Sequence, residues 1–482
     1  MNHKWTRRAL LGSAGAVAGA AAIGFGVLAS RDGAALVPGV SRARKVVGDD
    51  TLPAKVDVVV IGGGNVGCLT ALTLAERGLR VALCEKGVIA GEASGRSLGY
   101  IESQFLHPAK MEIIGRSKAL WAGMNERVQA ETGYRRTGLA TCFLDQAALD
   151  ATQGWIDAVH GEPGVDARLI TAGELNTLLP QAAGGSAGGF AGALYQPSDG
   201  CAEPTLAAPA IADAVRRHGG HVLQQCAVRG IETSAGRVSG VVTERGPIAC
   251  QAVVLAGGVW SPVLAHTLGL DVPQFMAFSG IARLSAAPGP QLSMISETGF
   301  ALRPTLTGGY DVCTAIGTAP ITPSTLRHLL RLRPALSHMW EQLRPAFDLG
   351  TFMAEWRIPT QWRLDQPSPF ETNRILMPET RHALLAEVVA NAKATLPALK
   401  DTQVLEQWSG ALMSTLDNMP VVSAADGVPG LYLGTGFYYG LTMGPAAGEA
   451  LADLVMGRQP QIDLAPYRYA RFHDGSPIVF HD

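Results

Sequence analysis

The stretch Val56–Arg96, VDVVVIGGGNVGCLTALTLAERGLRVALCEKGVIAGEASGR, decides the fold. Its first residues favour a β-strand and run into Gly62-Gly63-Gly64, and Gly67 completes the spacing G-x-G-x-x-G. An apolar helical pattern follows, and a second strand, Arg80–Cys84, leads to Glu85. This order of strand, glycine turn, helix, strand and acid predicts a βαβ unit that binds a dinucleotide.

Each part of this unit has a mechanical reason. Gly62 permits the tight turn, Gly64 lets the backbone approach a pyrophosphate, and Gly67 lets the helix pack on the strand. The unpaired N–H groups and the dipole at the start of the helix attract phosphates. Glu85 is placed to accept hydrogen bonds from ribose hydroxyls. The motif alone leaves NAD and FAD open.

Composition indicates a globular α/β protein with more than one domain. The chain has 482 residues, of which 47% are hydrophobic and 17% charged, with a net charge of −2. A chain of this length is longer than a single domain usually is. Its nearly balanced charge gives no general indication of nucleic-acid binding. The seven cysteines form no C-x-x-C pair and the eleven histidines no H-x-H cluster, so neither a disulfide framework nor a metal site is predicted.

The N-terminus carries the pair Arg7-Arg8, followed by a run without charge from Ala9 to Ser30. Such a run can cross a hydrocarbon core of ~30 Å as a helix, and its arginine pair resembles a twin-arginine export signal. We expect residues 1–30 to be a retained membrane anchor, with a cleaved signal as the alternative, and 31–54 to be a linker. This predicts a bacterial inner-membrane protein with a single anchor and a periplasmic catalytic domain.

Further pieces of the dinucleotide domain are expected far along the chain. Residues 204–255 indicate a helix and several short strands that end at Ala256-Gly257-Gly258. Leu431–Gly434 indicates a strand, and Pro445–Met456 a helix with proline at its first position. The dinucleotide domain is therefore predicted to be discontinuous, over 55–110, 201–274 and 407–473, with 111–200 and 275–406 forming a second domain.

Two features of the second domain bear on function. Arg303 lies in a predicted strand of the hairpin Phe300–Thr314. Burying an arginine in apolar surroundings costs free energy unless it is paired, so Arg303 is expected to form an ion pair with either a ligand carboxylate or an internal acid. Ser324–Phe347 is expected to be helical and carries four arginines. It is either a membrane-surface or lid element, within an insertion over about 324–369, or a solvated helix that packs on its own domain.

Several motifs together resemble one family, the FAD-dependent amine and amino-acid oxidoreductases of the D-amino-acid-oxidase superfamily, over nearly all of Lys55–Phe472. They are VVVIGGGNVG, GEASGR, AVVLAGGVWS, LRPTLTGGY and GTGFYYGLTMGPAAGE. Within this superfamily the chain is most similar to the membrane-bound L-amino-acid deaminases of Proteus-type bacteria, with which it shares LTLAERGLRV, EKGVIAGEASGR, CAVRGIET and GPAAGEALADLVMG.

The resemblance implies a Rossmann-type, glutathione-reductase-like FAD-binding domain with an inserted α+β substrate-binding domain. It implies FAD held without a covalent bond, and Arg303 as the residue that clamps the substrate carboxylate. The implied FAD-binding residues are Gly62, Gly64, Asn65, Val66, Gly67, Glu85, Lys86, Ser94, Gly95, Arg96, Val228, Gly257, Gly436, Gly440, Leu441, Thr442 and Met443.

The chain departs from the deaminases where the substrate should lie. They carry Ser-Gln where this chain has Gly99-Tyr100, a tryptophan where it has Tyr439, and a glutamate where it has Met443. Gly99, Tyr100 and Tyr439 are therefore candidate substrate-binding residues. A pocket lined by Tyr100, Tyr439 and Met443 is expected to favour apolar or aromatic substrates.

The function expected from the resemblance is oxidative deamination of an L-amino acid to a 2-oxo acid and ammonia. Hydride passes from Cα to flavin N5 without a required side-chain base. Electrons then pass to a respiratory acceptor, a quinone or a b-type cytochrome. A D-amino-acid, imino-acid or opine dehydrogenase is the nearest alternative, and a flavin-binding envelope factor without turnover is a remote one. The expected partners are an amino acid, membrane lipid and the acceptor, but no nucleic acid.

Overall fold

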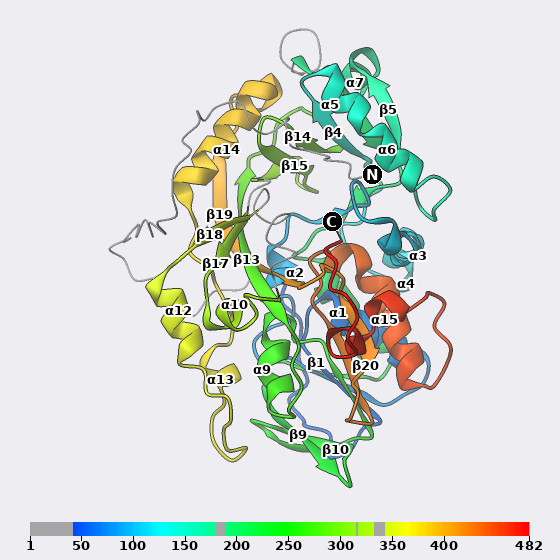
Figure 1. The fold of residues 1–482 in the computed structure, drawn as a ribbon, viewed down its shortest axis with the longest axis vertical. Coiled ribbons are helices and arrows are strands. Elements are labelled where there is room, and N and C mark those ends of the chain that lie inside the picture. Colours follow the sequence, from blue (N-terminus) through cyan, green and yellow to red (C-terminus); the bar gives the residue numbers. More distant parts are fainter. Residues whose placement is uncertain (1–41, 180–188, 315–316, 332–342, 482) are drawn as a thin grey trace.

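The computed structural model describes residues 42–179, 189–314, 317–331 and 343–481. Two large sheets organise this part of the chain (Figure 1). The first has six strands, in the spatial order β20 (Val421–Ala424), β21 (Leu431–Thr435), β12 (Ala252–Leu255), β1 (Val58–Ile61), β2 (Val81–Cys84) and β8 (His221–Leu223).

The six-stranded sheet is covered differently on its two faces. Its strands are parallel except for β20, which pairs antiparallel with β21. Helices cover one face: α1 (Asn65–Glu76) packs against both α8 (Ala207–Arg217) and α15 (Gly440–Val455), and α3 (Met111–Ala122) packs on α15. A second core cluster joins the other face to a three-stranded sheet of β9 (Val228–Ser234), β10 (Arg237–Thr243) and β11 (Gly246–Ala249).

The second large sheet is built mainly from the middle of the chain. Its order is β18 (Leu343–Ala346), β17 (Gly317–Pro320), β13 (Gln274–Leu284), β16 (Tyr310–Cys313), β15 (Phe300–Pro304), β14 (Ser293–Ser296), β4 (Leu139–Phe143), β6 (Gly192–Gln196) and β5 (Arg168–Thr171), with β19 (Val404–Thr415) also paired to β13. A small ribbon of β3 (Tyr100–Ile101) and β7 (Gly200–Cys201) follows the glycine-rich segment.

Shorter helices and one longer helix complete the described structure. The long α14 (His382–Thr395) packs on β15 and β16. Thr171 and Glu174 form a capping box at the start of α7. The other helices are α2 (Ala93–Arg96), α4 (Met124–Arg127), α5 (Gln146–Ala151), α6 (Gln153–Ala158), α7 (Ala172–Leu178), α9 (Ser261–His266), α10 (Pro323–Arg327), α12 (Leu349–Trp356) and α13 (Pro369–Thr372).

The predicted fold class is confirmed: a doubly covered, mostly parallel sheet is joined to a second α+β unit. The two strands β13 and β19 pair along almost their whole length, from Gln274 with Thr415 to Leu284 with Val404. β13 begins and β19 ends near the six-stranded sheet, because Gln274 accepts a hydrogen bond from Thr435 at the end of β21. These long strands therefore connect the two units.

The C-terminal helix begins earlier than predicted. It starts at Gly440, so Pro445 lies inside α15 and not at its first position. Proline has no N–H group, and the carbonyl of Leu441 four residues earlier loses its helical donor. The indole Nε1–H of Trp121 replaces that donor and lies 2.9 Å from the Leu441 oxygen. A residue of α3 therefore makes the buried proline compatible with the helix.

The long helix predicted over Ser324–Phe347 is wrong. The described residues there form the short α10, which ends at Arg327, and the strand β18. Residues 332–342 lie outside the described part.

The predicted membrane location is corrected. The proposed anchor over residues 1–30 lies outside the described residues. Within the described ranges, no helix is both long and apolar enough to cross a bilayer. An inner-membrane protein with one N-terminal anchor is therefore not supported by the structure.

Candidate active site

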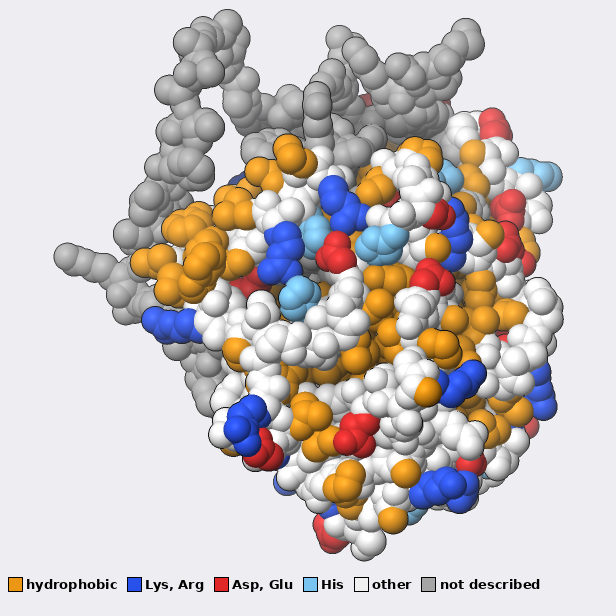
Figure 2. Space-filling view, turned by 60° about the horizontal axis from the view of Figure 1, so that its bottom comes forward, with side chains coloured by type: hydrophobic (Ala, Val, Ile, Leu, Met, Phe, Trp, Pro, Cys, Tyr) orange, Lys and Arg blue, Asp and Glu red, His pale blue; other side chains and the backbone are white. Residues whose placement is uncertain are grey.

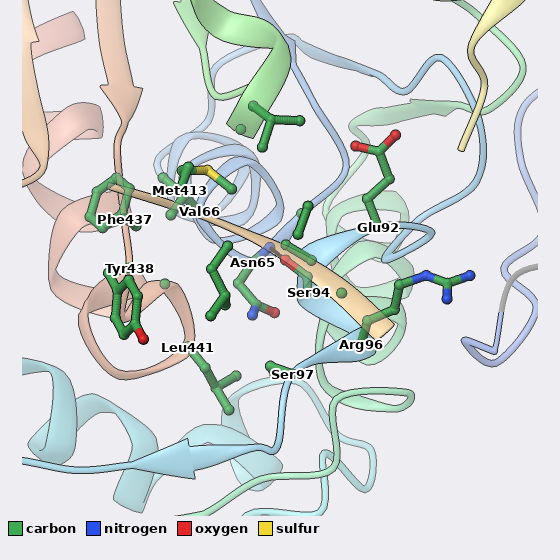
Figure 3. Close-up of a pocket in the computed structure, with 18 of the residues that line it drawn as sticks. Asn65, Val66, Glu92, Ser94, Arg96, Ser97, Met413, Phe437, Tyr438 and Leu441 are labelled. Carbon is green, nitrogen blue, oxygen red and sulfur yellow. Dashed lines mark hydrogen bonds between the residues drawn. The ribbon is translucent and has the colours of Figure 1, made fainter. Parts of the chain in front are cut away.

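A cavity of about 470 Å³ runs between the two large sheets. One end is formed by the turn between β1 and α1 and by the residues after β2, and the other by the segment before α15 together with β13, β15 and β16. Figure 3 shows Asn65, Ser94 and Arg96 on one side of this space and Phe437, Tyr438 and Leu441 on the other. The sequence motifs at residues 62–67, 91–96 and 434–442 thus meet in one site.

The glycine turn has the close contacts that its spacing predicts. Gly62 has φ of +111°, and a Cβ there would lie 2.4 Å from the Ala256 oxygen. A Cβ on Gly67 would lie 1.9 Å from the Gly62 oxygen. Any side chain at either position would force the turn open, because such contacts are far inside van der Waals distance. These two glycines hold the β1–α1 turn closed beside the cavity.

Glu85 lines the cavity at the end of β2 and is held by backbone groups. Its Oε2 accepts a hydrogen bond from the Gly63 N–H and its Oε1 one from the Gly87 N–H, both at 2.7 Å. Burial raises the pKa of this carboxyl group above its usual range. Each carboxylate oxygen has a second acceptor position, so Glu85 can still accept hydrogen bonds from ribose hydroxyls.

Polar atoms in the middle of the cavity lack partners among the described residues. The Asn65 Oδ1 and Ser97 Oγ atoms are buried without a hydrogen bond, and both residues line the cavity. Ser94 is engaged, because its Oγ accepts the Asn65 N–H at 3.0 Å. Buried polar groups are normally satisfied, so unsatisfied atoms in a cavity indicate a ligand with several hydrogen-bonding groups. The site fits a flavin dinucleotide, whose ribityl chain carries hydroxyls.

The cations of the cavity lining are engaged by protein oxygens. They are Lys86 and Arg96. The Lys86 ammonium donates to Glu92 and to two backbone carbonyls at 2.6–3.0 Å. The Arg96 guanidinium donates to the carbonyls of Gly91 and Ser409.

The far end of the cavity is mostly apolar and aromatic. Tyr100 contributes its ring, since its hydroxyl lies 2.8 Å from the carbonyl oxygens of Met294 and Leu302 in the second sheet. Tyr438 and Tyr439 pack edge to face with ring centroids 4.9 Å apart. Further lining residues here are Phe105, Ile281, Ile295, Ala301, Cys313, Thr314 and Leu441. The shape of this end suits an apolar side chain.

Arg303 has internal acids as partners. It is 1% exposed, and its guanidinium lies 3.1 Å from Glu203 and 2.5 Å from Asp311. Arg283 also binds both acids. Arg303 lies on the same strand face as Ala301 but does not line the cavity. The sequence left a ligand carboxylate and an internal ion pair open, and the geometry supports the ion pair.

Gly99 separates Arg303 from the cavity. A Cβ there would lie 3.0 Å from the Arg303 Nε and 2.5 Å from the Ala202 oxygen, and φ is +97°. The local backbone therefore requires glycine at this position. The departure from Ser-Gln in the deaminases coincides with a tight passage of β3 beneath the cavity.

Glu102 is a site residue that the sequence analysis missed. It lines the cavity two residues after Tyr100, and its N–H donates to the Thr442 hydroxyl at 3.2 Å. Burial raises the pKa of its carboxyl group to about 8, and the nearby Asp199 adds to this effect. Alternation in an extended segment places residues 100, 102 and 104 on one side, a signal that could have revealed it.

Most predicted site residues line the cavity, but five do not. Those that line it are Gly62, Gly64, Asn65, Val66, Glu85, Lys86, Ser94, Arg96, Gly99, Tyr100, Val228, Gly257, Tyr439, Gly440, Leu441 and Thr442. Gly67, Gly95, Arg303, Gly436 and Met443 lie behind the lining. Met443 is fully buried in the helical core on α15, so it does not shape the substrate end as the sequence suggested.

Known proteins match this chain over most of its length. Residues 57–454 match the family described as FAD dependent oxidoreductase. The L-amino acid deaminase of Proteus myxofaciens, solved in complex with anthranilate, superposes with a TM-score of 0.85 at 35% identity, covering 90% of this chain and 97% of that one. The L-amino acid deaminase of Proteus vulgaris superposes with a TM-score of 0.84 at 32% identity, covering 89% of this chain and 100% of that one.

Curated relatives extend the comparison. Glycine oxidase from Pseudomonas aeruginosa is 29% identical over 85% of this chain and 97% of its own length. Human mitochondrial sarcosine dehydrogenase is 24% identical over 88% of this chain, which spans only 42% of that protein.

The chain therefore belongs to the DAO family of FAD-dependent oxidoreductases, and FAD is its cofactor. This confirms the enzyme class predicted from the sequence, which acts on CH–NH2 donors, and the predicted similarity to the Proteus L-amino acid deaminases.

Proposed function

We propose that this protein oxidises the α-amino group of an L-amino acid, giving a 2-oxo acid and ammonia. The observation that supports this most strongly is the match to two L-amino acid deaminases over about nine-tenths of the chain. The match covers 90% and 89% of this chain, so it includes residues of the units on both sides of the cavity. Bound FAD supplies the acceptor for the Cα hydrogen and its electron pair.

The residues of the chain act mainly by orientation and by excluding water. The segment before α15 presents Tyr438 and Tyr439 to the cavity, and β3 presents Tyr100, whose hydroxyl reaches the second sheet. Each ring is fixed, Tyr100 by its hydroxyl and the tyrosine pair by edge-to-face packing. A substrate held between rigid rings can be aligned with its Cα–H toward the flavin, and alignment of this kind contributes much of the rate.

The lining favours substrates with large apolar or aromatic side chains. No charged group other than Glu102 lines the described substrate end, so a charged substrate side chain would be buried without a partner. Phenylalanine and leucine are the natural test substrates, and aspartate and lysine should be poor ones.

A second candidate is oxidation of an amine without a carboxylate. It is favoured by one observation: Arg303 is already neutralised by Glu203 and Asp311, and the lining cations Lys86 and Arg96 bind protein oxygens. A substrate carboxylate would need one of these groups to change partners.

One experiment separates these functions. The purified yellow protein is mixed without oxygen with L-phenylalanine, D-phenylalanine, proline and 2-phenylethylamine, and bleaching of the flavin spectrum is followed. Bleaching by L-phenylalanine alone supports the deaminase. Bleaching by 2-phenylethylamine at a similar rate supports the amine oxidase, and bleaching by no compound in a wider amine panel would contradict both.

The electron acceptor is tested in the same preparation. The sequence predicts a quinone or b-type cytochrome, so reoxidation of the bleached protein by a soluble quinone should be faster than by oxygen. Equal or faster reoxidation by oxygen would identify an oxidase.

A further inference from the structure

Glu102 is a partly buried acid at the cavity, and the described residues around it provide no counter-ion. Its carboxylate has no hydrogen bond and no ion pair with any described residue. The nearest cation, Lys118 on α3, is engaged elsewhere: its ammonium lies 2.5 Å from Asp199 and donates to Ser103 and the Gly164 carbonyl. A buried carboxylate without a partner is costly.

The position of Glu102 is fixed at the substrate end of the cavity. Its N–H binds the hydroxyl of Thr442 in the first turn of α15, and the same hydroxyl lies 3.4 Å from the Tyr100 carbonyl. The acid is close enough to Tyr438 and Cys313 to raise the pKa of both groups further. Glu102 therefore lies where the flavin loop, β3 and β16 meet.

Burial and the negative charge of Asp199 disfavour the charged form of Glu102, and the other titratable groups around it except Lys118 are uncharged near neutral pH. Asp199 lies behind it in the segment before β7, Tyr100 on its own strand, Cys313 on β16 and Tyr438 on the flavin loop. Lys118 on α3 opposes them, although its charge is shared with Asp199. The site would accept one further positive charge on the cavity side.

We propose that Glu102 is the receptor for the amino group of the substrate, pairing with the ammonium form and taking its proton before oxidation. This inference rests on the proposed function for the reaction but not for the binding step. It assigns the acidic group a role that the sequence analysis, which required no side-chain base, did not foresee.

The proton balance is simple. The ionised carboxylate of Glu102 and the ammonium of the substrate share one proton, which moves to Glu102 and leaves a neutral amine. The nitrogen lone pair can then form the C=N bond as the Cα hydrogen leaves with its electron pair to the bound FAD. The product is a protonated imine, which water hydrolyses to the 2-oxo acid and ammonium. A carboxyl group with a pKa of about 8 is ionised only as the pH approaches 8 and above, so this step is expected to become faster over that pH range.

Three related ligands test the binding step directly. L-Phenylalanine has both charged groups, 2-phenylethylamine only the amine, and 3-phenylpropanoate only the carboxylate. Their dissociation constants are measured from changes in the flavin absorption spectrum without oxygen, or from protection against thermal unfolding for a ligand that reduces the flavin. The wild-type holoenzyme is compared with Glu102→Gln, Glu102→Asp and a control, Glu387→Gln, in which the same change is made at an exposed acid on α14. FAD content per chain is measured for each.

Glu102→Gln is expected to raise the dissociation constant of 2-phenylethylamine at least tenfold and to leave that of 3-phenylpropanoate unchanged or lower. Glu102→Asp is expected to keep part of the affinity for the amine. In the wild type, amine binding should change with pH around 8, and this change should vanish in Glu102→Gln. Equal weakening of all three ligands, or loss of FAD alone, would show a structural role and overturn the proposal.

The wild-type pH dependence keeps the test decisive if Glu102→Gln does not fold, because amine binding that is flat between pH 7 and 9 would also overturn the proposal. Failure of the proposed function gives a different result. If amines bind through Glu102 but none bleaches the flavin, amino-group binding by Glu102 is supported and the proposed oxidation is contradicted. If L-phenylalanine bleaches the flavin of the wild type and of Glu102→Gln at equal rates and with equal affinity, the proposed oxidation is supported and the role of Glu102 is contradicted.

Discussion

At the scale of single residues, two ionisable groups beside the cavity have opposite surroundings. Arg303 contacts two carboxylates and lies behind the cavity wall. Glu102 faces the cavity, and no described residue neutralises it. The first arrangement satisfies the charge within the fold, while the second leaves it for a ligand. The partners of each group distinguish them, because both residues lie close to the same cavity.

Replacing Arg303 by alanine should destabilise the protein by about 3–5 kcal/mol, because Glu203 and Asp311 would keep buried charges with one partner fewer. Arg283→Ala is the matched control, since it contacts the same acids from a more exposed position. Its cost should be about 1 kcal/mol. Urea unfolding measures both. If the Arg303→Ala protein has normal stability and loses affinity only for ligands with a carboxylate, the result would instead support the prediction that Arg303 binds the substrate carboxylate.

Glu102 should make stability fall with rising pH. Its pKa of about 8 in the folded protein lies above its ordinary value of 4.5, so the unfolded state releases this proton first. The contribution is fully favourable below about pH 4.5 and is lost as pH rises toward 8, by on the order of 4 kcal/mol. Glu102→Gln should therefore be more stable than the wild type at pH 9, with a flatter pH dependence of the melting temperature. A less stable variant at pH 9 would contradict this.

At the scale of elements, α15 depends on a residue that is distant in sequence. Its internal Pro445 leaves the Leu441 carbonyl without a helical donor, and Trp121 on α3 supplies one. The same first turn carries Thr442, which holds the N–H of Glu102. The contact between α3 and α15 therefore positions both the flavin loop and the substrate end.

Trp121→Phe should lower the free energy of unfolding by about 2–3 kcal/mol, because the buried Leu441 carbonyl would lose its hydrogen-bond donor. Trp155→Phe is a suitable comparison: its indole also donates to a backbone carbonyl, that of Leu106, but from a partly exposed position where water can replace it. Its cost should stay below about 1 kcal/mol. Thermal unfolding of the two variants distinguishes them, and equal costs would show that the proline needs no donor.

At the scale of the whole molecule, the cavity is the boundary between two units that are interleaved in sequence. Its wall combines the β1–α1 turn, β3 and the α15 entry with strands β13 to β16 of the second sheet. On the face shown in Figure 2, acidic and basic side chains are interspersed, with hydrophobic side chains gathered across the middle.

Removing FAD should lower the melting temperature, because a ligand held between two units stabilises both by mass action. At a free concentration of 100 times Kd, the gain is about 2.7 kcal/mol. FAD is removed by dialysis at high salt and added back in steps, and the melting temperature is followed by circular dichroism. AMP and FMN serve as controls, since each fills only part of the cavity. A melting temperature independent of added FAD would contradict a cofactor role in joining the units.

The sequence determined the flavin end of the site because that end depends on local geometry. Glycines at 62 and 67 are required by contacts within one turn, and Glu85 follows the adjacent strand, so spacing alone predicts their arrangement. The hairpin around Arg303 and the capping box at Thr171 were predictable for the same reason. Local rules failed for the start of α15, because the donor that tolerates Pro445 comes from Trp121, far away in the chain.

Only the tertiary structure decided the substrate end. Whether Arg303 meets a ligand or an acid depends on Glu203, 100 residues earlier in the chain, and no spacing rule relates the two. Glu102 became a candidate because the fold leaves it without a counter-ion while Lys118 is bound to Asp199. Charge pairing is a property of space and not of sequence distance, and for this reason the sequence alone specified the cofactor but not the groups that meet the substrate.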